Sequence, residues 1–157
     1  EITNPGEPLV DPLRFIDTPP KSRNEVLASL TRRFRICEER GSGIDKVVDQ
    51  VEFYQLPAPQ FEVPEGFTKA VLFSYRPLNQ MDKADRVRAC YLHACLKWVM
   101  RDYLTNASLR ERFGVEEKNK AAVSRYIREA VEDGAIKPFD EGASRKLMKY
   151  IPFWAKV

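Results

Sequence analysis

Residues 105–128 read TNASLRERFGVEEKNKAAVSRYIR, and this stretch decides the fold that we expect for the second half of the chain. Glycine readily adopts the left-handed conformation that ends a helix, and Gly114 divides the stretch into two segments. The pattern predicts a short helix capped by Asn106, a turn at residues 113–115, and a longer helix from about residue 119 to 133. The apolar residues at helical spacing are Leu109 and Phe113 before the glycine, and Val123, Ile127, Ala130 and Val131 after it.

Helical periodicity also precedes this stretch, and a strand pattern follows it. Residues 83–101 repeat apolar residues on one helical face. Gly134 is expected to end the longer helix, and residues 135–139 and 149–154 have the composition of two strands around a polar tip. Three helices followed by a hairpin form the outline of a winged helix-turn-helix. We therefore expect this fold for residues 81–157.

The first half of the chain predicts a mixture of helices and strands. One helix is expected within residues 22–36, and a second opens after the glycines at 41 and 43. Strand patterns near residues 60–64 and 68–75 flank a Glu-Gly pair and favour a hairpin. The expected fold class of the whole chain is therefore α+β.

A change from strand to helical periodicity at residues 77–82 predicts a boundary between two domains, 1–80 and 81–157. The chain carries a formal net charge of +3, but its two parts differ. Residues 81–157 contain 16 Lys and Arg against 11 Asp and Glu, whereas residues 1–80 contain 10 against 12. The positive charge of the second part favours a polyphosphate partner.

The remaining composition excludes several classes of protein. No apolar run approaches the roughly 20 residues of a membrane span, so we expect no membrane contact. Three cysteines without C-x-x-C spacing favour the reducing cytoplasm over a disulfide framework, and they predict no metal site. The single histidine, His93, has no catalytic partner nearby in the sequence and is expected to be structural. Because the chain begins at Glu1 without a methionine, we expect it to be a fragment of a longer protein.

The second helix of a helix-turn-helix enters the major groove of DNA, so its outward face must be polar and basic. Positions three and four apart are neighbours on a helix, which places residues 124, 125 and 128 on one face. At the tip of the hairpin, Arg145 and Lys146 are expected to contact the DNA backbone beside the groove. Double-stranded DNA is therefore the expected partner. The residues expected to bind it on this helix are Lys118, Asn119, Lys120, Ser124, Arg125 and Arg128.

Other interpretations of the charged face remain open. A charged helix face is often only solvated, and the glutamates at 116, 117, 129 and 132 dilute the basic residues. Winged helices also serve as protein-interaction modules, which is an alternative function for this chain. Arg110 and Arg112, on the shorter helix, are further candidates for DNA contact.

Three segments resemble a known family: ITNPG at residues 2–6, ERGSGI at residues 39–44, and residues 105–119. Over nearly its whole length the chain is similar to the C-terminal part of bacterial and archaeal transcriptional regulators related to RecG-type ATP-dependent DNA helicases. The resemblance implies a Schlafen-like AlbA domain upstream, then a divergent GHKL-type ATPase-like domain of which residues 1–80 are the C-terminal remnant, then a winged helix. The implied protein is a DNA-binding transcriptional regulator, which we expect to form a homodimer.

In GHKL-type folds two glycine motifs flank a nucleotide, and both have counterparts in this chain. The resemblance assigns cofactor binding to Asn4, Gly6, Gly41, Ser42 and Gly43, with ATP and Mg²⁺ as cofactors of the full-length protein. Glycines at a helix start let backbone N–H groups approach a phosphate. The alternative is that the later glycines only form a tight turn into the helix. The chain has no G-x-x-x-x-G-K-[ST] phosphate loop, so nothing in it supports strand separation driven by ATP hydrolysis. We expect no catalytic residue and no cofactor in this fragment, and an ATPase is the second hypothesis after DNA binding.

Overall fold

The computed structural model describes residues 1–36, 41, 43–144 and 147–156. Its elements form a mixture of helices and small antiparallel sheets, which confirms the expected α+β class. Within these ranges, none of the helices has both the length and the apolar character that crossing a membrane requires. In chain order, with η for a 3-10 helix, the elements are β1 (Ile2–Pro5), η1 (Pro12–Arg14), α1 (Glu25–Arg33), α2 (Gly43–Phe53), β2 (Gln60–Glu62), β3 (Phe67–Val71), η2 (Leu78–Gln80), α3 (Lys83–Val99), α4 (Asn106–Phe113), η3 (Glu117–Asn119), α5 (Lys120–Glu132), β4 (Ile136–Pro138) and β5 (Tyr150–Pro152).

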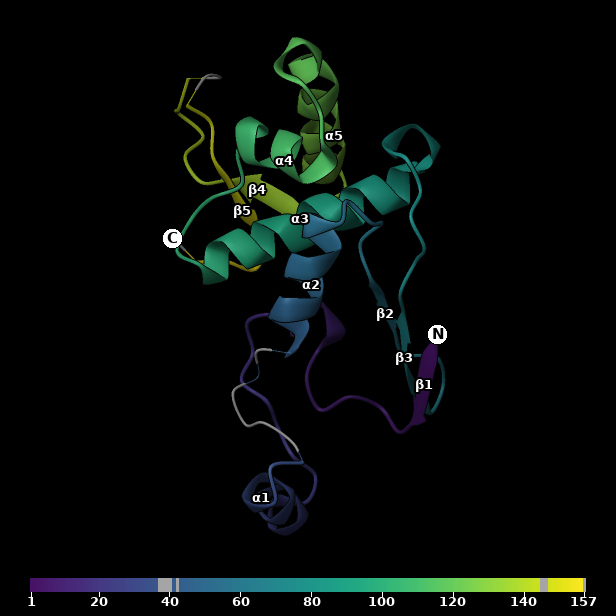
Figure 1. Ribbon diagram of the computed structural model, residues 1–157. Helices are drawn as coiled ribbons and strands as arrows, with labels where there is room; N and C mark the ends of the chain where they lie inside the picture. Colours follow the sequence, from purple (N-terminus) through teal and green to yellow (C-terminus); the bar gives the residue numbers. More distant parts are fainter. Residues whose placement is uncertain (37–40, 42, 145–146, 157) are drawn as a thin grey trace.

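The long helix α3 lies at the centre of the molecule, with α4 and α5 on one side and α2 on the other (Figure 1). It starts at Asp82, whose side chain accepts a hydrogen bond from the Asp85 backbone N–H (2.8 Å) and so satisfies a free donor of the first turn. From Ala89 to Leu96 every side chain of α3 is buried. A helix that is buried on all faces needs other elements around it, so the rest of the fold is packed around α3.

The second half of the chain has the predicted order of helices and strands. Gly114 adopts a φ of 62° and ends α4, and Gly134, with a φ of 70°, follows α5. Leu109 and Val123 are fully buried in the core that α4 and α5 share with α3. The strands β4 and β5 pair antiparallel, and β5 contacts α3.

Two helix boundaries differ from the prediction. Thr105, rather than Asn106, caps α4: its Oγ1 accepts the Ser108 N–H (3.1 Å), and Ser108 Oγ accepts the Thr105 N–H (3.0 Å). This reciprocal pair satisfies two donors that the helix start would otherwise leave free. The helix expected from residue 119 begins at Lys120, because the preceding residues form the tighter turn η3.

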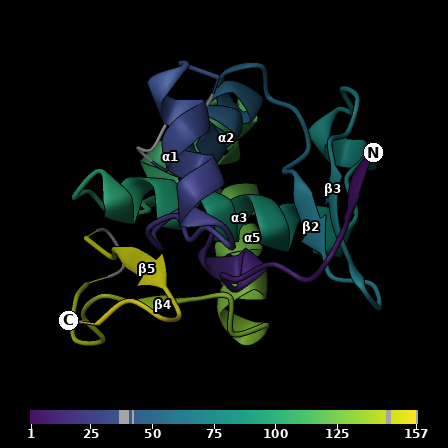
Figure 2. The same cartoon turned by 90° about the horizontal axis from the view of Figure 1, so that it is seen from below.

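A three-stranded antiparallel sheet in the order β1-β3-β2 occupies the first half. Strands β2 and β3 form the predicted hairpin, with Gly66 at a φ of 76° in its turn. Strand β1 pairs with β3 so that Asn4 lies opposite Thr68. Figure 2 shows this sheet and the β4–β5 hairpin at opposite ends of the molecule.

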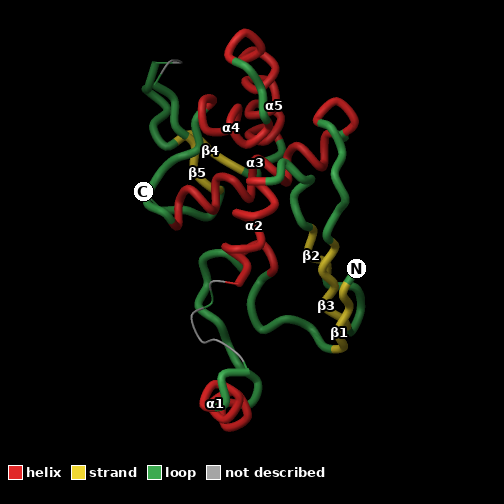
Figure 3. Tube along the Cα trace, viewed as in Figure 1, coloured by secondary structure: helices red, strands yellow, loops and turns green. Residues whose placement is uncertain are grey.

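The helix α2 comes from the first half of the sequence but packs against the helices of the second half. Val48 and Val51 are buried, and α2 contacts both α3 and α4. The helix α1, in contrast, extends away from the other helices (Figures 1 and 3). Helical spacing predicted α1 correctly, but its apolar side chains are exposed in this chain: Val26, Leu27, Leu30 and Phe34.

Residues from both sides of the predicted boundary at 77–82 contribute to one hydrophobic core. Ile16, Val48, Ala58 and Met81 pack with the buried side chains of α3, α4 and α5. Polar contacts add to this packing, since the Tyr91 hydroxyl donates to the Leu13 carbonyl and accepts from Trp154 Nε1 (3.0 Å). The two parts of the sequence are therefore held together around α3.

Candidate functional site

The exposed face of α5 carries the basic residues that the sequence singled out. Ser124, Arg125 and Arg128 are exposed, as is Lys120 at the first position of the helix. The opposite face of α5 is buried through Val123, Tyr126, Ile127 and Ala130. Figure 1 shows α5 and the described parts of the β4–β5 connection extending to the same side of α3, opposite α1 and α2.

The other residues predicted to contact DNA have different positions. Lys118 and Asn119 are exposed but lie in η3 rather than in the first turn of the longer helix. Arg145 and Lys146, predicted for the hairpin tip, lie outside the described residues. Arg112 is 3% exposed and packs in the core, so its candidacy for DNA contact is wrong.

The basic side chains on this face differ in whether they already have a carboxylate partner. Arg125 and Arg128 form no ion pair with any described residue, and the Arg125 guanidinium lies 5.5 Å from the centre of the Tyr126 ring. The lysines have carboxylate partners: Lys118 Nζ is 2.5 Å from a Glu116 oxygen, and the Lys120 amine is 4.0 Å from the next glutamate. Exposed ion pairs of this kind contribute little to stability and are readily exchanged, but the two arginines are available to an anion without any exchange.

Asn106 joins the two helices at this face, a role that the sequence did not indicate. Its Nδ2 donates to Ser124 Oγ (3.0 Å) and to the Lys120 carbonyl (3.1 Å). Its Oδ1 accepts a hydrogen bond from Arg110 Nε (3.2 Å). The first turn of α4 is therefore fixed against the outward face of α5.

A cavity of about 730 Å³ between the β1–η1 segment and the start of α2 is a second candidate site. Both predicted glycine motifs line it, Asn4 and Gly6 from the first, and Gly41 and Gly43 from the second. Ser42, the remaining residue predicted for cofactor binding, lies outside the described residues. The structure therefore brings together two motifs that are far apart in the sequence.

The walls of this cavity combine apolar side chains with two cations. Leu9, Phe15, Ile44 and Val47 are among the apolar residues, and Lys21 and Arg23 provide positive charge. Arg23 Nη2 also donates to the carbonyl of Glu7, an acidic residue of the same lining. These walls suit a ligand that has both an apolar body and an anionic group.

The two glycine motifs differ in what their backbone offers such a ligand. The Gly6 N–H donates to the Gly66 carbonyl (2.7 Å), and the Gly6 carbonyl accepts from Thr68 Oγ1 (2.7 Å), so neither group is free. The N–H groups of Gly43 and Ile44 lie at the start of α2, where a helix provides no internal acceptor. Gly41 has a φ of 66°, and a Cβ there would lie 2.9 Å from Pro20 Cδ, so the left-handed backbone and the close approach of Pro20 are enough to explain a glycine at this position.

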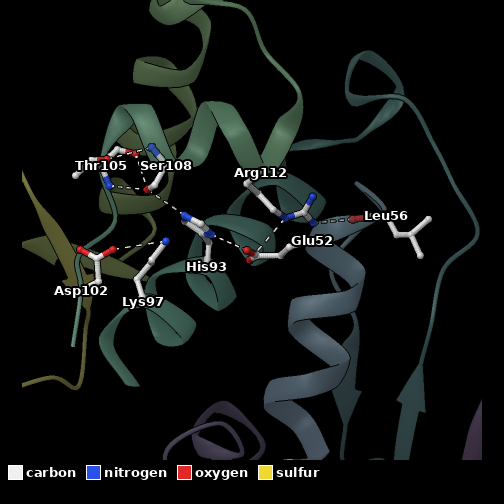
Figure 4. Close-up of polar contacts among 8 residues, drawn as sticks. All are labelled: Glu52, Leu56, His93, Lys97, Asp102, Thr105, Ser108 and Arg112. Carbon is white, nitrogen blue, oxygen red and sulfur yellow. Dashed lines mark hydrogen bonds and ion pairs between the residues drawn. The ribbon is translucent and has the colours of Figure 1, made fainter. Parts of the chain in front are cut away.

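A buried polar network joins α2 to α3 and α4 (Figure 4). His93 Nδ1 lies 2.8 Å from Glu52 Oε2, and His93 Nε2 lies 3.0 Å from Ser108 Oγ. Arg112 Nη2 donates to the Leu56 carbonyl (2.6 Å), and its Nε lies 3.7 Å from Glu52 Oε1. Burial lowers the pKa of the Arg112 guanidinium, while the Glu52 carboxylate raises it. The partners of His93 lie 41 and 15 residues away in the sequence, so neighbouring residues did not indicate them.

The order Ser108, His93, Glu52 has the spacing of a nucleophile, a base and an acid in a hydrolase. However, Ser108 Oγ also accepts the Thr105 N–H and donates to the Thr105 carbonyl (3.2 Å), so it is held as a helix cap. His93 is 3% exposed, and neither residue lines the cavity described above. The network therefore positions α4. Within the described residues, no three His, Cys, Asp or Glu side chains are grouped as metal ligands are.

Comparisons with known proteins bear on the first half of the chain. No curated protein and no solved structure matches this chain. Residues 1–72 match the family model described as "Putative ATP-dependent DNA helicase recG C-terminal". The match extends from β1 to the end of β3 and includes both glycine motifs, so the segment that forms the cavity is similar to the C-terminal domain of the RecG-related family.

Proposed function

We propose that this chain binds double-stranded DNA through the exposed face of α5, and that it acts as a DNA-binding transcriptional regulator. The observation that carries this proposal is the pair Arg125 and Arg128, exposed on one face of a helix that follows a tight turn at Gly114 and free of carboxylate partners among the described residues. A helix presented in this way fits the major groove, and arginine hydrogen-bonds guanine edges and phosphates there. Phosphate contacts would supply most of the affinity.

The test is fluorescence anisotropy with a labelled duplex of about 30 base pairs, long enough for two half-sites one helical turn apart. We expect binding of the wild-type chain to weaken steeply between roughly 50 and 200 mM salt, as counterion release requires. The double variant Arg125→Glu/Arg128→Glu should lose this binding. A matched control is Arg33→Glu/Arg35→Glu, which changes the net charge by the same amount as the α5 variant. Arg33 is the last residue of α1 and Arg35 lies just beyond it; both are exposed, and α1 lies away from α5 (Figure 1).

Three outcomes have distinct meanings. Loss of binding in the α5 variant but not in the control supports the proposed interface. Equal loss in both variants means that DNA responds only to net charge, and the α5 interface is then rejected. No binding by the wild-type chain at the lower salt leaves protein interaction as the function of this face. A molar mass measured by light scattering, with and without duplex, tests the homodimer that we expect to occupy two half-sites.

The cavity supports a second candidate function, the binding of a nucleotide or another phosphate-bearing ligand. The convergence of both glycine motifs with Lys21 and Arg23 carries this proposal. The cations and the first N–H groups of α2 would hold the phosphate, and the apolar walls would hold the remainder of the ligand. A rise in melting temperature with MgATP or Mg-pyrophosphate that is absent in Lys21→Ala/Arg23→Ala supports it. A flat response of the wild-type protein leaves the glycines as turn residues.

A further inference from the structure

The helix α2 borders both candidate sites. Its first turn contributes Gly43, Ile44 and Val47 to the cavity walls. Its middle is anchored in the core through Val48 and Val51, and its last turn carries Glu52 into the network with α3 and α4. With a rise of about 1.5 Å per residue, this short helix connects the cavity to the helix-turn-helix as a single rigid element.

We propose that α2 couples occupancy of the cavity to DNA binding, with Glu52 as the positioning residue that transmits the effect to α4. The proposal rests on the two functions proposed above and adds that they depend on each other. Coupling between two sites requires an element with two arrangements, whose balance each ligand changes. We assign this role to the contacts around Glu52.

The pair formed by Glu52 and Arg112 is buried but incompletely closed. The two side chains are 14% and 1% exposed, and Glu52 Oε1 lies 3.7 Å from Arg112 Nε. Among the described residues, Glu52 Oε1 and the Nε and Nη1 of Arg112 have no hydrogen-bond partner. Buried charged atoms without hydrogen bonds are unfavourable. A shift of roughly 0.8–1 Å would bring the pair to the distance of a charge-assisted hydrogen bond, so a closed arrangement lies close to the one described.

The same contacts would carry such a shift to the DNA-binding face. Arg112 lies in the last turn of α4, and Ser108, in its first turns, is bonded to His93, which Glu52 also holds. At its outward end α4 is tied to α5 by Asn106, which donates to Ser124 Oγ and to the Lys120 carbonyl. A ligand that holds the first turn of α2 restricts the positions open to this helix and favours the closed pair. Occupancy of the cavity is therefore expected to order α4 and to tighten DNA binding.

The test uses magnesium pyrophosphate as the cavity probe and the full chain throughout. Calorimetry measures pyrophosphate binding, and anisotropy measures the DNA dissociation constant with and without the probe at matched ionic strength. In the wild-type chain we expect DNA binding to tighten at least about fivefold, the lower end of typical allosteric coupling. In Glu52→Gln both ligands should still bind, but adding pyrophosphate should change the DNA dissociation constant by less than about twofold. Asp49→Asn, which removes a carboxylate from an exposed position of the same helix, should couple as the wild type does.

If pyrophosphate competes directly with DNA for the same residues, the DNA dissociation constant should rise instead of falling. An anion that only displaces DNA from Arg125 and Arg128 weakens DNA binding, and it does so equally in Glu52→Gln. That result overturns the coupling, as does an unchanged dissociation constant in a wild-type chain that binds both ligands. These outcomes leave both proposed functions intact, whereas an absence of pyrophosphate binding removes the cavity function and the coupling together.

Hydrogen exchange of the wild-type chain gives a measurement that depends neither on a variant nor on DNA. Pyrophosphate should slow amide exchange across residues 106–113, because closure of the buried pair orders α4. Unchanged exchange in α4 when the probe occupies the cavity overturns the proposal, even if Glu52→Gln fails to fold. If the chain binds pyrophosphate but no duplex, slowed exchange in α4 shows that α2 transmits occupancy and that only the DNA-binding function has failed.

Discussion

The turn at Gly114 allows a quantitative test of how the two parts of the chain meet. Gly114 has a φ of 62°, and a Cβ added there would lie 2.6–2.9 Å from the Nε2, Oε1 and Cδ atoms of Gln55. Gly134 has a similar φ of 70°, but a Cβ added there meets nothing within 4 Å. The left-handed conformation costs an L-residue about 1–2 kcal/mol at either position. Only Gly114→Ala must also displace the Gln55 side chain, which adds about 0.5–1.5 kcal/mol if that side chain is forced from a favoured rotamer.

The assay is thermal or urea unfolding of Gly114→Ala, Gly134→Ala and Gln55→Ala, and of each glycine variant combined with Gln55→Ala. We expect Gly114→Ala to cost about 1.5–3.5 kcal/mol and Gly134→Ala about 1–2 kcal/mol. For a chain of this size the difference corresponds to a few degrees in melting temperature, at about 2–4 °C per kcal/mol. In the Gln55→Ala background the two glycine variants should cost the same, because only the backbone penalty remains.

Two results would refute this reasoning. Equal costs of the two glycine variants in the wild-type chain would mean that Gln55 does not cover the turn. A difference that persists after Gln55→Ala would place the extra cost elsewhere, in the backbone of the turn itself. Either result would also argue against a close contact between Gln55, which follows α2, and the turn between α4 and α5.

Three further predictions follow from buried or capped groups. Burial raises the pKa of the Cys90 and Cys95 thiols to about 12, so in a Cys37→Ser background a thiol reagent should label the folded chain only after denaturation. The pKa values of the two thiols in the folded chain exceed the unfolded value of about 9. The stability contributed by the protonated thiols is therefore complete below pH 9 and is lost as the pH rises through about 12. An alkaline unfolding titration checks this loss. Burial also raises the pKa of Asp45, so Asp45→Asn should stabilise the chain near neutral pH, with the gain disappearing as pH falls below the unfolded value of about 3.9; a constant difference across this range contradicts the assignment. Thr105→Ala should cost about 1 kcal/mol in chemical unfolding while Thr105→Ser costs much less, and equal costs would show that Thr105 is not the cap.

Local signals in the sequence predicted most of the elements. Gly114 and Gly134 follow helices at the expected positions because glycine adopts a positive φ at little steric cost. The periodicity of residues 119–133 predicted a helix with a polar face, and α5 presents that face outward. The choice of cap for α4 failed, because Thr105 and Asn106 are both favourable caps and the choice between them depends on the side chain of Ser108.

Contacts between distant segments could not be predicted in this way. His93 has partners on α2 and α4, and no helical or strand periodicity relates those positions to one another. The exposed apolar face of α1 is a related case, since spacing shows that Leu27 and Leu30 share a face but not what covers it. The cavity is intermediate, because the sequence indicated its two glycine motifs separately and only the fold places Gly6 and Gly41 on one cavity.

The boundary predicted at residues 77–82 divides the sequence in two, whereas the packing joins residues from both sides of it in one core. Periodicity changes there because strand β3 has ended and helix α3 begins, and this is a property of neighbouring residues along the chain. Packing depends on which surfaces need to be covered, and α3 is buried on all faces only because α2 covers the one that α4, α5 and β5 leave open. A fragment of residues 81–157 would lose Val48, Val51 and Glu52 together, so Arg112 and His93 would lose their carboxylate partner and part of their apolar cover. The interior of α4 and α5 therefore depends on α2, and this dependence is the physical basis of the coupling proposed between the cavity and the exposed face of α5.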